Sequence, residues 1–562
     1  MHDSAPDVSL SATTVPSARS SRQLASRLRG LVCYGCLGLG LAIVGVRADD
    51  ASTPTSEVST SELKTMSLED LITYQVYSVS KTKESLSQAP SAIQVITEDD
   101  IRRSGATSIP EALRLADNLT VAQRGAHEWV ISARGFGTDL ANKMLVMIDG
   151  RTVYTPLFSG VFWDRQNYLL SDIDHIEVIS GPGGTLWGAN AVNGVINIIT
   201  KSAKDTQGVL VQQGFGTDPR EYTAMRYGGK LGDDTSYRVY GTYFERANAD
   251  YANNDDVNDS WQAGQGGFRT DTDVTPDDLL TLQGDYYRNL EAVPTGRDAV
   301  TNGSNLLSRW THTVSDESKM SLQLYYDHTY LYDPVPAFVI GSTTFAPAGT
   351  LIDRLDTYDM DFQHRFRLDE RNRIVWGIGF RHTRDTLTNS PSLGFYPDDL
   401  QSNLYSAFLQ DEIMLLDNLF LTLGSKVEHN SYTGFEYEPN VRLQLNITPH
   451  HTVWAAVSRA VRTPSRAETW MVEMSVLPAM RRWNVRRGMM MTSSRSVPKA
   501  DCPLTSSRPT TSQETLLTRT LCPRASALPN SLSRTVSPRM QAARPLRISP
   551  SRKCRPAVSA QS

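Results

Sequence analysis

Residues 180–201 contain a cluster of glycines that could form a ligand-binding loop. The stretch reads SGPGGTLWGANAVNGVINIITK, and glycine clusters of this kind can cradle phosphate groups. A P-loop would follow Gly183 and Gly188 with Lys and then Ser or Thr, but Ala and Asn stand there. A dinucleotide-binding loop would have its third glycine where Leu186 stands and would lead into a helix, whereas GVINIIT is strand-like. We therefore interpret these glycines as residues of tight turns that pack closely against a neighbouring part of the protein, followed by a buried strand.

Other polar patterns give little support for catalysis or metal binding. The sequence has neither the His-Glu-x-x-His motif of zinc proteases nor the Gly-x-Ser-x-Gly motif of hydrolases. All five cysteines lie near the two ends, so the body has no cysteine-based metal site. An Asp/Asn-rich stretch at 253–259 suits Ca²⁺ but lacks EF-hand spacing, which favours a solvated loop. We expect no catalytic residue, no cofactor and no metal site.

The N-terminus has the features of an export signal. Arginines precede the apolar run LVCYGCLGLGLAIVGV (31–46), and VRA before Asp49 suits cleavage by a signal peptidase. The run is shorter than the ~20 apolar residues of a membrane-spanning helix. We predict a signal peptide over residues 1–48, with a membrane anchor or a lipid-modified Cys36 as alternatives.

The body of the chain changes its hydrophobic period near Gly208. Before that point, short strands alternate with helices that begin at Thr97 and near Pro110, which predicts an α+β domain. After it, segments such as RIVWGIGFRHT alternate apolar and polar positions, and we count roughly 13 of them as far as residue 464. Long strands joined alternately by short turns and long loops are typical of a transmembrane β-barrel. A soluble β-sandwich or propeller, with shorter strands, is the alternative.

Charge and composition divide the chain further. The formal net charge is −5, but both ends are basic, so the body is strongly acidic and unsuited to nucleic acid. From Trp470 onward the alternation stops, Phe and Tyr are absent, and Arg, Ser and Pro dominate. The favoured explanation is a shift of reading frame near Thr469, and a natural basic disordered tail is the alternative.

Several of these stretches resemble one family. IEVISGPGGTLWGANAVNGVINIITK resembles the plug signature of TonB-dependent outer-membrane receptors, and VISARGFGTDLANKMLVMIDGRTVYTPLFSGVFWD resembles their Arg-Gly-Phe and Asp-Gly segments. FLQDEI, EPNVRL and AAVSRAVRTPSRAE look like their barrel strands, so the resemblance covers residues 67–468. It departs from the family at Ser180, where an arginine is usual.

The resemblance implies an N-terminal α+β plug domain followed by an antiparallel transmembrane β-barrel, with a disordered C-terminal tail. About 13 strands would be present of the ~22 expected for a plugged barrel. The implied segments are a signal peptide (1–48), a periplasmic segment (49–80), the plug (81–204), a partial barrel (205–468) and an aberrant, out-of-frame tail (469–562). The residues that the resemblance assigns to packing between plug and barrel are Arg134, Gly135, Phe136, Gly181, Pro182 and Gly188.

By the same resemblance, the protein is a monomeric receptor surrounded by the outer-membrane lipid of a Gram-negative bacterium. It binds an iron chelate such as a ferric siderophore, or next a corrinoid such as vitamin B12. A TonB-type protein of the inner membrane pairs with a short extended segment. The segment that we predict for this TonB interaction is Val76, Tyr77, Ser78, Val79 and Ser80, with a simple first plug strand as the alternative.

Solute contacts in such receptors come from plug apices and outer loops. Aromatic and cationic groups suit an anionic chelate, although ordinary plug packing would also explain them. The six residues predicted for solute binding are Arg124, His127, Trp129, Tyr154, Phe158 and Trp163.

We expect this form of the receptor to be truncated and inactive as a transporter. A plug-only periplasmic binding module, a non-functional gene fragment and a soluble β-rich secreted enzyme are the alternatives.

Overall fold

The structure is a computed structural model. It describes residues 75–78, 81, 84–135, 137, 141, 143–251, 253, 255–293, 297–340, 342–448 and 451–473. The predicted signal peptide, most of the predicted periplasmic segment, Val79, Ser80, Phe136 and the tail from residue 474 lie outside the described residues. Within the described ranges, no helix has the length and apolar character needed to cross a membrane.

The N-terminal part is an α+β domain, and we call its residues 75–205 the plug. Its main sheet has five strands in the order β3-β8-β9-β6-β7, in which β6 and β9 are parallel and the other neighbours antiparallel. These strands are β3 (Ala92–Thr97), β8 (Ile173–Ser180), β9 (Gly194–Thr200), β6 (Met144–Ile148) and β7 (Arg151–Thr152). Two antiparallel pairs accompany the sheet: β1 (Gln75–Val76) with β2 (Glu84–Ser85), and β4 (Leu119–Gln123) with β5 (Trp129–Ala133).

Three short α-helices complete the plug: α3 (Glu98–Ser104), α4 (Ile109–Ala112) and α5 (Gly184–Trp187). The predicted cap at Thr97 is confirmed, because its hydroxyl accepts from the Asp100 backbone N–H while the Asp100 carboxylate accepts from the Thr97 backbone N–H. Ile96, Ile176 and Ile196 are at most 1% exposed and form the core between α3, α4 and the sheet.

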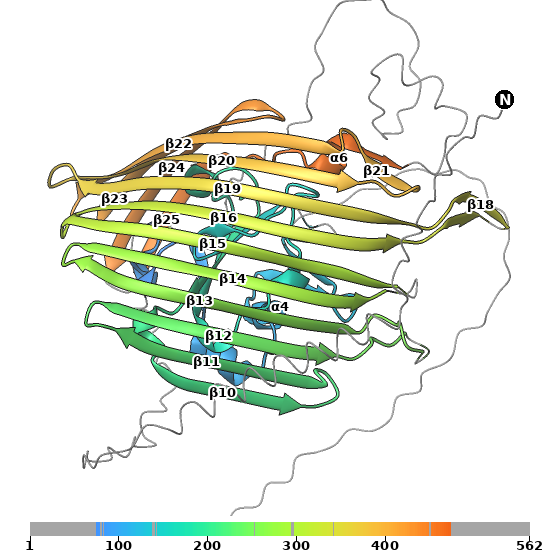
Figure 1. Ribbon diagram of the computed structural model, residues 1–562. Helices are drawn as coiled ribbons and strands as arrows, with labels where there is room; N and C mark the ends of the chain where they lie inside the picture. Colours follow the sequence, from blue (N-terminus) through green and yellow to red (C-terminus); the bar gives the residue numbers. More distant parts are fainter. Residues whose placement is uncertain are drawn as a thin grey trace, which may run out of the picture. The chain divides into compact units, whose positions relative to one another are not determined.

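Most of the remaining described residues form one 13-stranded sheet, which confirms the predicted antiparallel barrel strands and their number. Every neighbouring pair is antiparallel, and within the described residues β10 and β25 are the two ends of the sheet. Figure 1 shows the strands crossing the view from β10 at the bottom to β22 near the top. The strands are β10 (Gly208–Phe215), β11 (Glu221–Leu231), β12 (Thr235–Arg246), β13 (Trp261–Thr275), β14 (Asp278–Ala292), β15 (Asp298–Ser315), β16 (Ser318–Val335), β19 (Gly349–Arg367), β20 (Asn372–Thr388), β22 (Asp399–Leu416), β23 (Leu419–Asn430), β24 (Gly434–Thr448) and β25 (His451–Ser458).

The period of two separates the faces of this sheet. Ile378 is 46% exposed on the outer face, whereas Arg381 lies on the inner face and donates to Thr152 of the plug. At one end the strands are joined by tight turns, as between β15 and β16; at the other end, long connections carry β17 (Phe338–Ile340), β18 (Thr343–Ala346) and β21 (Leu393–Phe395). We call these the short-turn end and the long-loop end.

After β25 the chain leaves the sheet. It forms α6 (Arg466–Trp470) and then β26 (Met471–Glu473), which pairs with β21. We call residues 459–467 the inner strap, because they contact the plug.

Candidate functional site

A cavity of about 1090 Å³ separates one side of the plug from the inner face of the sheet. Its wall comes from strands between β13 and β23, and its plug side from residues 75–77, Lys81, the β6–β7 hairpin and residues near Trp187. Tyr77 and Gln363 line it towards the short-turn end, while Arg165 and Thr329 line it towards the long-loop end. The cavity therefore extends along the strands beside the plug.

The Asp149–Gly150 turn brings the plug to this wall. Both residues have positive φ, 50° and 79°, the conformation of a tight hairpin turn. The Asp149 carboxylate accepts from the Thr200 backbone N–H (2.9 Å) and from Gln283 of β14 (2.9 Å). Burial raises the pKa of Asp149, but Arg269 and these hydrogen bonds outweigh burial and lower it, so the carboxylate is ionised.

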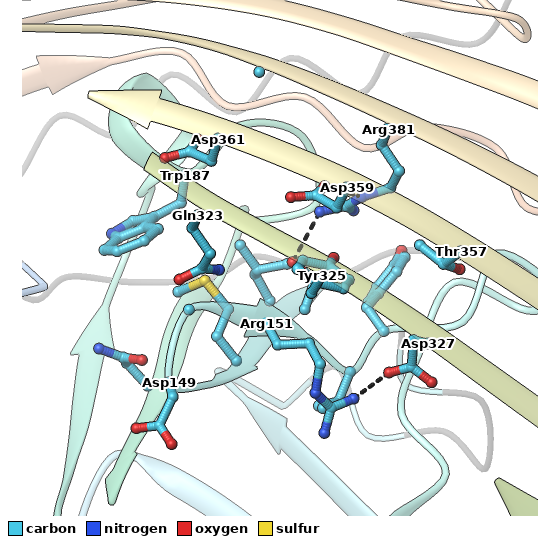
Figure 2. A pocket seen from close by; sticks show the side chains of 18 of the residues that line it. Asp149, Arg151, Trp187, Gln323, Tyr325, Asp327, Thr357, Asp359, Asp361 and Arg381 are labelled. Carbon is cyan, nitrogen blue, oxygen red and sulfur yellow. Dashed lines mark hydrogen bonds and ion pairs between the residues drawn. The ribbon is translucent and has the colours of Figure 1, made fainter. Parts of the chain in front are cut away.

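Ion pairs line the middle of the cavity. Arg151 extends from the plug to Asp327 of β16, and its guanidinium also donates to the Tyr168 hydroxyl at 2.9 Å. On the wall, Arg381 pairs with Asp359 at 2.8 Å. Figure 2 shows Arg151 reaching Asp327 across the space, with Arg381 and Asp359 beside each other above it. This lining offers paired charged groups and tyrosine hydroxyls on long side chains, which can rearrange around a polar solute.

The first plug residues close the short-turn end of the cavity. Val76 is fully buried and Ser78 is 1% exposed. The backbone N–H groups of Tyr77 and Ser78 donate to the Glu177 carboxylate at 2.7 and 2.8 Å, and the Tyr77 hydroxyl accepts from Gln363 of β19 at 2.7 Å. The described part of the predicted TonB-interaction segment is thus held inside the plug.

The glycine stretch lies against β23 and β24 at the border of the same cavity, where two strand carboxylates approach its backbone. A Cβ atom on Gly184 would stand 2.5 Å from Glu438 Oε1, and one on Gly188 would stand 2.1 Å from Glu428 Oε1. Both glutamates are at most 2% exposed, and Glu428 accepts from the Ala189 backbone N–H. The glycines therefore permit a close approach of wall and plug, rather than cradling a phosphate.

The inner strap completes this wall. The Asn190 side chain donates to the Thr463 hydroxyl (3.1 Å) and accepts from the Thr463 backbone N–H (3.0 Å). Arg466 is fully buried and pairs with Asp385 of β20 at 2.7 Å, and its backbone N–H donates to the Pro156 carbonyl of the plug. The strap thus joins two plug loops to β20.

The predicted solute-binding residues do not gather in one place. Tyr154 lines the cavity. Trp129 and Trp163 are 7% and 6% exposed in the plug core, which favours the packing interpretation for both. Phe158 packs with Leu351 and neighbouring apolar side chains.

The two remaining predicted solute contacts lie on the apical loop before β5. The Arg124 side chain is 57% exposed and pairs with Glu128, while His127 Nδ1 is 3.8 Å from Glu291 of β14. Asp259 from the Asp/Asn-rich stretch closes over the same loop, since its carboxylate accepts from the backbone N–H groups of Ala126 and Ala249. That carboxylate fastens a loop to the plug apex.

The predicted packing residues are also divided. Gly188 contacts the wall, Gly181 lies 3.3 Å, measured from an added Cβ, from the Arg134 guanidinium, and Pro182 is half-buried. Arg134 and Gly135 are exposed and have positive φ, 58° and 75°.

Sequence reasoning missed the paired charges of the cavity. Asp327, Asp359 and Arg381 all stand at inward positions of strands whose alternation was recognised. A charged residue on the inward parity of such a strand was a usable signal for the wall. Arg151 follows directly after the Asp-Gly turn, and no local pattern indicates its partner 176 positions away.

Comparisons with known proteins match both parts of the chain. The family model "TonB-dependent Receptor Plug Domain" matches residues 85–195, and "TonB dependent receptor-like, beta-barrel" matches residues 187–476. The chain is 25% identical over 421 residues to the iron-regulated outer membrane virulence protein of Vibrio cholerae, covering 68% of the chain and 59% of that relative. It is 24% identical over 461 residues to the ferric enterobactin receptor of Pseudomonas aeruginosa, covering 69% of the chain and 60% of that receptor.

A shorter match and two solved structures complete the comparison. The vitamin B12 transporter BtuB of Vibrio vulnificus is 29% identical over 171 residues, which is 30% of the chain and 26% of that transporter. The siderophore receptor PirA of Acinetobacter baumannii superposes with a TM-score of 0.56 at 17% identity, covering 68% of the chain and 62% of PirA. The ferripyoverdine receptor of P. aeruginosa gives 0.57 at 15% identity, covering 69% and 59%. These superpositions show the shared fold, and the chain spans about 60% of the length of its longer matches.

Proposed function

Because the chain belongs to the TonB-dependent receptor family, we propose that it is a receptor for the TonB-dependent uptake of a scarce solute, and that the solute is an iron chelate. The truncation of this form and its inactivity as a transporter stay predictions. The family consists of receptors rather than enzymes, and its relatives confirm the predicted location in the outer membrane of a Gram-negative bacterium. The soluble secreted enzyme is therefore unsupported.

The cavity beside the plug is the observation that carries this proposal. It extends from the long-loop end to residues 75–77 and Lys81 at the short-turn end, and its middle is lined by ion pairs and hydroxyl groups. A solute bound among the outer loops would have to pass the plug, and this space supplies a polar path beside it. Long paired side chains such as Arg151 and Arg381 would exchange partners with an anionic chelate as it moves.

The choice of an iron chelate rests on the relatives. The matches that cover more than two thirds of the chain include an iron-regulated protein and a ferric enterobactin receptor. The B12 transporter matches only 30% of the chain. A corrinoid is therefore the second candidate, supported by that shorter match.

Residues 76–80 are the segment that we assign to coupling with a TonB-type protein. Strand addition to a partner requires free backbone donors and acceptors, whereas the Tyr77 and Ser78 N–H groups are bound to Glu177. The segment would therefore have to leave Glu177 before or while it pairs with the partner.

The test is solute binding to the purified chain in detergent, measured by quenching of tryptophan fluorescence. A ferric catecholate, a ferric hydroxamate and cyanocobalamin are titrated separately. We expect quenching by an iron chelate at micromolar concentration and little by cyanocobalamin. Preference for cyanocobalamin would move the assignment to a corrinoid, and quenching by none of the three would contradict the proposed function.

A pair of matched double variants locates the site. Arg381→Gln with Asp359→Asn removes an ion pair of the cavity, and we expect it to weaken chelate binding at least tenfold. Arg373→Gln with Glu412→Gln removes a pair at the short-turn end, where the Arg373 side chain is 67% exposed. The second variant should bind as the unaltered chain does.

A further inference from the structure

One buried carboxylate holds the first described residues of the plug. Glu177 of β8 is fully buried, and its two oxygens accept separately from the backbone N–H groups of Tyr77 and Ser78. These are consecutive amides of an extended segment, so a single side chain replaces a neighbouring strand for them. Glu177 is thus the acceptor on which the end of this segment depends.

A second pair of side chains supports that carboxylate. His175, two residues away on the same strand, places Nε2 3.2 Å from Glu177 Oε1, and its Nδ1 is 2.5 Å from the Asp174 carboxylate. Burial lowers the pKa of His175, but its bonds to Asp174 and Glu177 outweigh burial and raise it to about 9. Burial likewise raises the pKa of Glu177, while the donors His175, Ser78 and Tyr77 prevail and lower it. At neutral pH the pair is therefore an imidazolium beside a carboxylate.

Other contacts fix Ser78 in the same position. Its hydroxyl accepts from the Asn197 side chain at 2.8 Å, and its carbonyl accepts from the Trp187 indole at 2.9 Å. Lys81, 5% exposed, lies over the Trp187 ring at 4.9 Å and 4.0 Å from Asp361 of β19. These side chains come from β9, α5 and the wall, so the segment contacts both the plug and the wall at this end of the cavity.

The segment also closes the cavity at this end. Val76, Tyr77 and Lys81 line it, and the Tyr77 hydroxyl is bound by Gln363 on the opposite wall. Removing residues 75–78 from their place would break the hydrogen bond that joins the plug to Gln363. One of the two amides that hold the segment and the side chain that meets the wall therefore belong to the same residue, Tyr77.

We propose that Glu177, supported by His175 and Asp174, is the latch that holds residues 75–78 in the plug, and that its release opens the cavity at the short-turn end. The opening step rests on the proposed function, because it presumes that a partner pulls on the segment. The holding step does not depend on that function. His175 is a positioning residue, since it acts on the segment only through Glu177.

The holding step is tested by hydrogen exchange of the full chain in detergent, read on the peptide that contains residues 75–81. Glu177→Gln keeps the shape but turns one acceptor oxygen into an NH₂ group that faces a backbone N–H. We expect exchange of this peptide to rise at least tenfold in Glu177→Gln and about threefold in His175→Asn. If Glu177→Gln does not fold, His175→Asn decides alone, and exchange as in the unaltered chain would overturn the latch.

Asp149→Asn is the matched control. Asp149 is another buried plug carboxylate that accepts a backbone N–H, that of Thr200, but it does not touch residues 75–78. Its variant should speed exchange at residue 200 and leave the 75–81 peptide unchanged. Equal acceleration of both peptides would show general loosening of the plug and would contradict a dedicated latch.

The opening step has its own readout. Thr357 lines the cavity, so Thr357→Cys reports access to it when a charged thiol reagent is added and the peptide containing residue 357 is analysed. We expect labelling at least fivefold faster in the Glu177→Gln background. Faster exchange without faster labelling would overturn the opening step and leave the latch standing. Neither readout involves a chelate, so failure of the proposed function is seen separately in the quenching titrations.

Discussion

The plug meets the strands in different ways at two places. At the glycine stretch, which we call the tight seam, Glu428 and Glu438 touch the plug backbone and the inner strap adds Thr463 and Arg466. In the middle of the cavity, contact is made through long side chains such as Arg151.

This difference assigns the two places different mechanical roles. A backbone held at van der Waals distance cannot shift without breaking its contacts, because packed interiors deform little. Flexible charged side chains can follow a moving partner by changing rotamer. We infer that the plug would move on its cavity side and remain seated at the tight seam.

The largest expected effect comes from the inner strap. Arg466→Met removes the partner of Asp385 and leaves a buried carboxylate uncompensated, which costs about 3–5 kcal/mol. We expect a matching fall in the free energy of unfolding, measured by urea titration in detergent. The double variant with Asp385→Asn should recover most of the loss. If Arg466→Met alone were as stable as the unaltered chain, the strap would not contribute to holding the tight seam.

Gly188 gives the next largest effect. Its φ of 85° and the nearby Glu428 oxygen both oppose a side chain, so Gly188→Ala should destabilise the chain by about 2–4 kcal/mol. Gly105→Ala is the control, since Gly105 has a φ of 71° but no atom within 4 Å of an added Cβ. It should lose only about 1 kcal/mol, and an equal loss in both variants would mean that wall contact adds nothing.

The cavity side should respond to pH instead. The pKa of His175 is raised from 6.5 to about 9 by folding, so its contribution to stability is complete below about pH 6.5 and is lost as pH rises through 9. The whole contribution is about 2 kcal/mol, discounted because Asp174 is half exposed. Urea titrations at pH 6 and pH 10 should show this loss in the unaltered chain, and His175→Asn should lack it.

The smallest effects belong to two tyrosines of the cavity. The Tyr168 hydroxyl accepts from Arg151 and donates to Asp285, so Tyr168→Phe should cost about 1–2 kcal/mol. Within the described residues the Tyr325 hydroxyl has no hydrogen-bond partner, so Tyr325→Phe should change the free energy of unfolding by less than about 0.5 kcal/mol. Comparable losses of the free energy of unfolding in the two variants would show that the cavity lining is held as firmly as the tight seam.

The sequence was most informative where a local pattern determines the structure. The capping box at Thr97 and the alternating strands beyond Gly208 depend on neighbours a few residues away, and both were predicted. The glycine stretch was interpreted as packing against a wall, but the residues that form that wall, Glu428 and Glu438, were not identified.

The site was harder to predict because its contacts join distant parts of the chain. Glu177 bonds residues 99 and 100 positions away, and no sequence spacing indicates such a pair. Aromatic type alone does not separate core from site at Trp129 and Trp163, since large aromatic side chains serve cores as well as binding sites. Their predicted solute contact, like that of the other four residues, stays a prediction.

The bond between Asn190 and Thr463 spans 273 positions. Contacts this distant in sequence form late, because the loop that joins them must first be closed. Every strand from β10 to β25 lies within that loop. Assembly of the sheet and docking of the plug are therefore coupled kinetically. The Asn190–Thr463 hydrogen bond forms only after strands β10 to β25 have paired and the loop that contains Asn190 is in place.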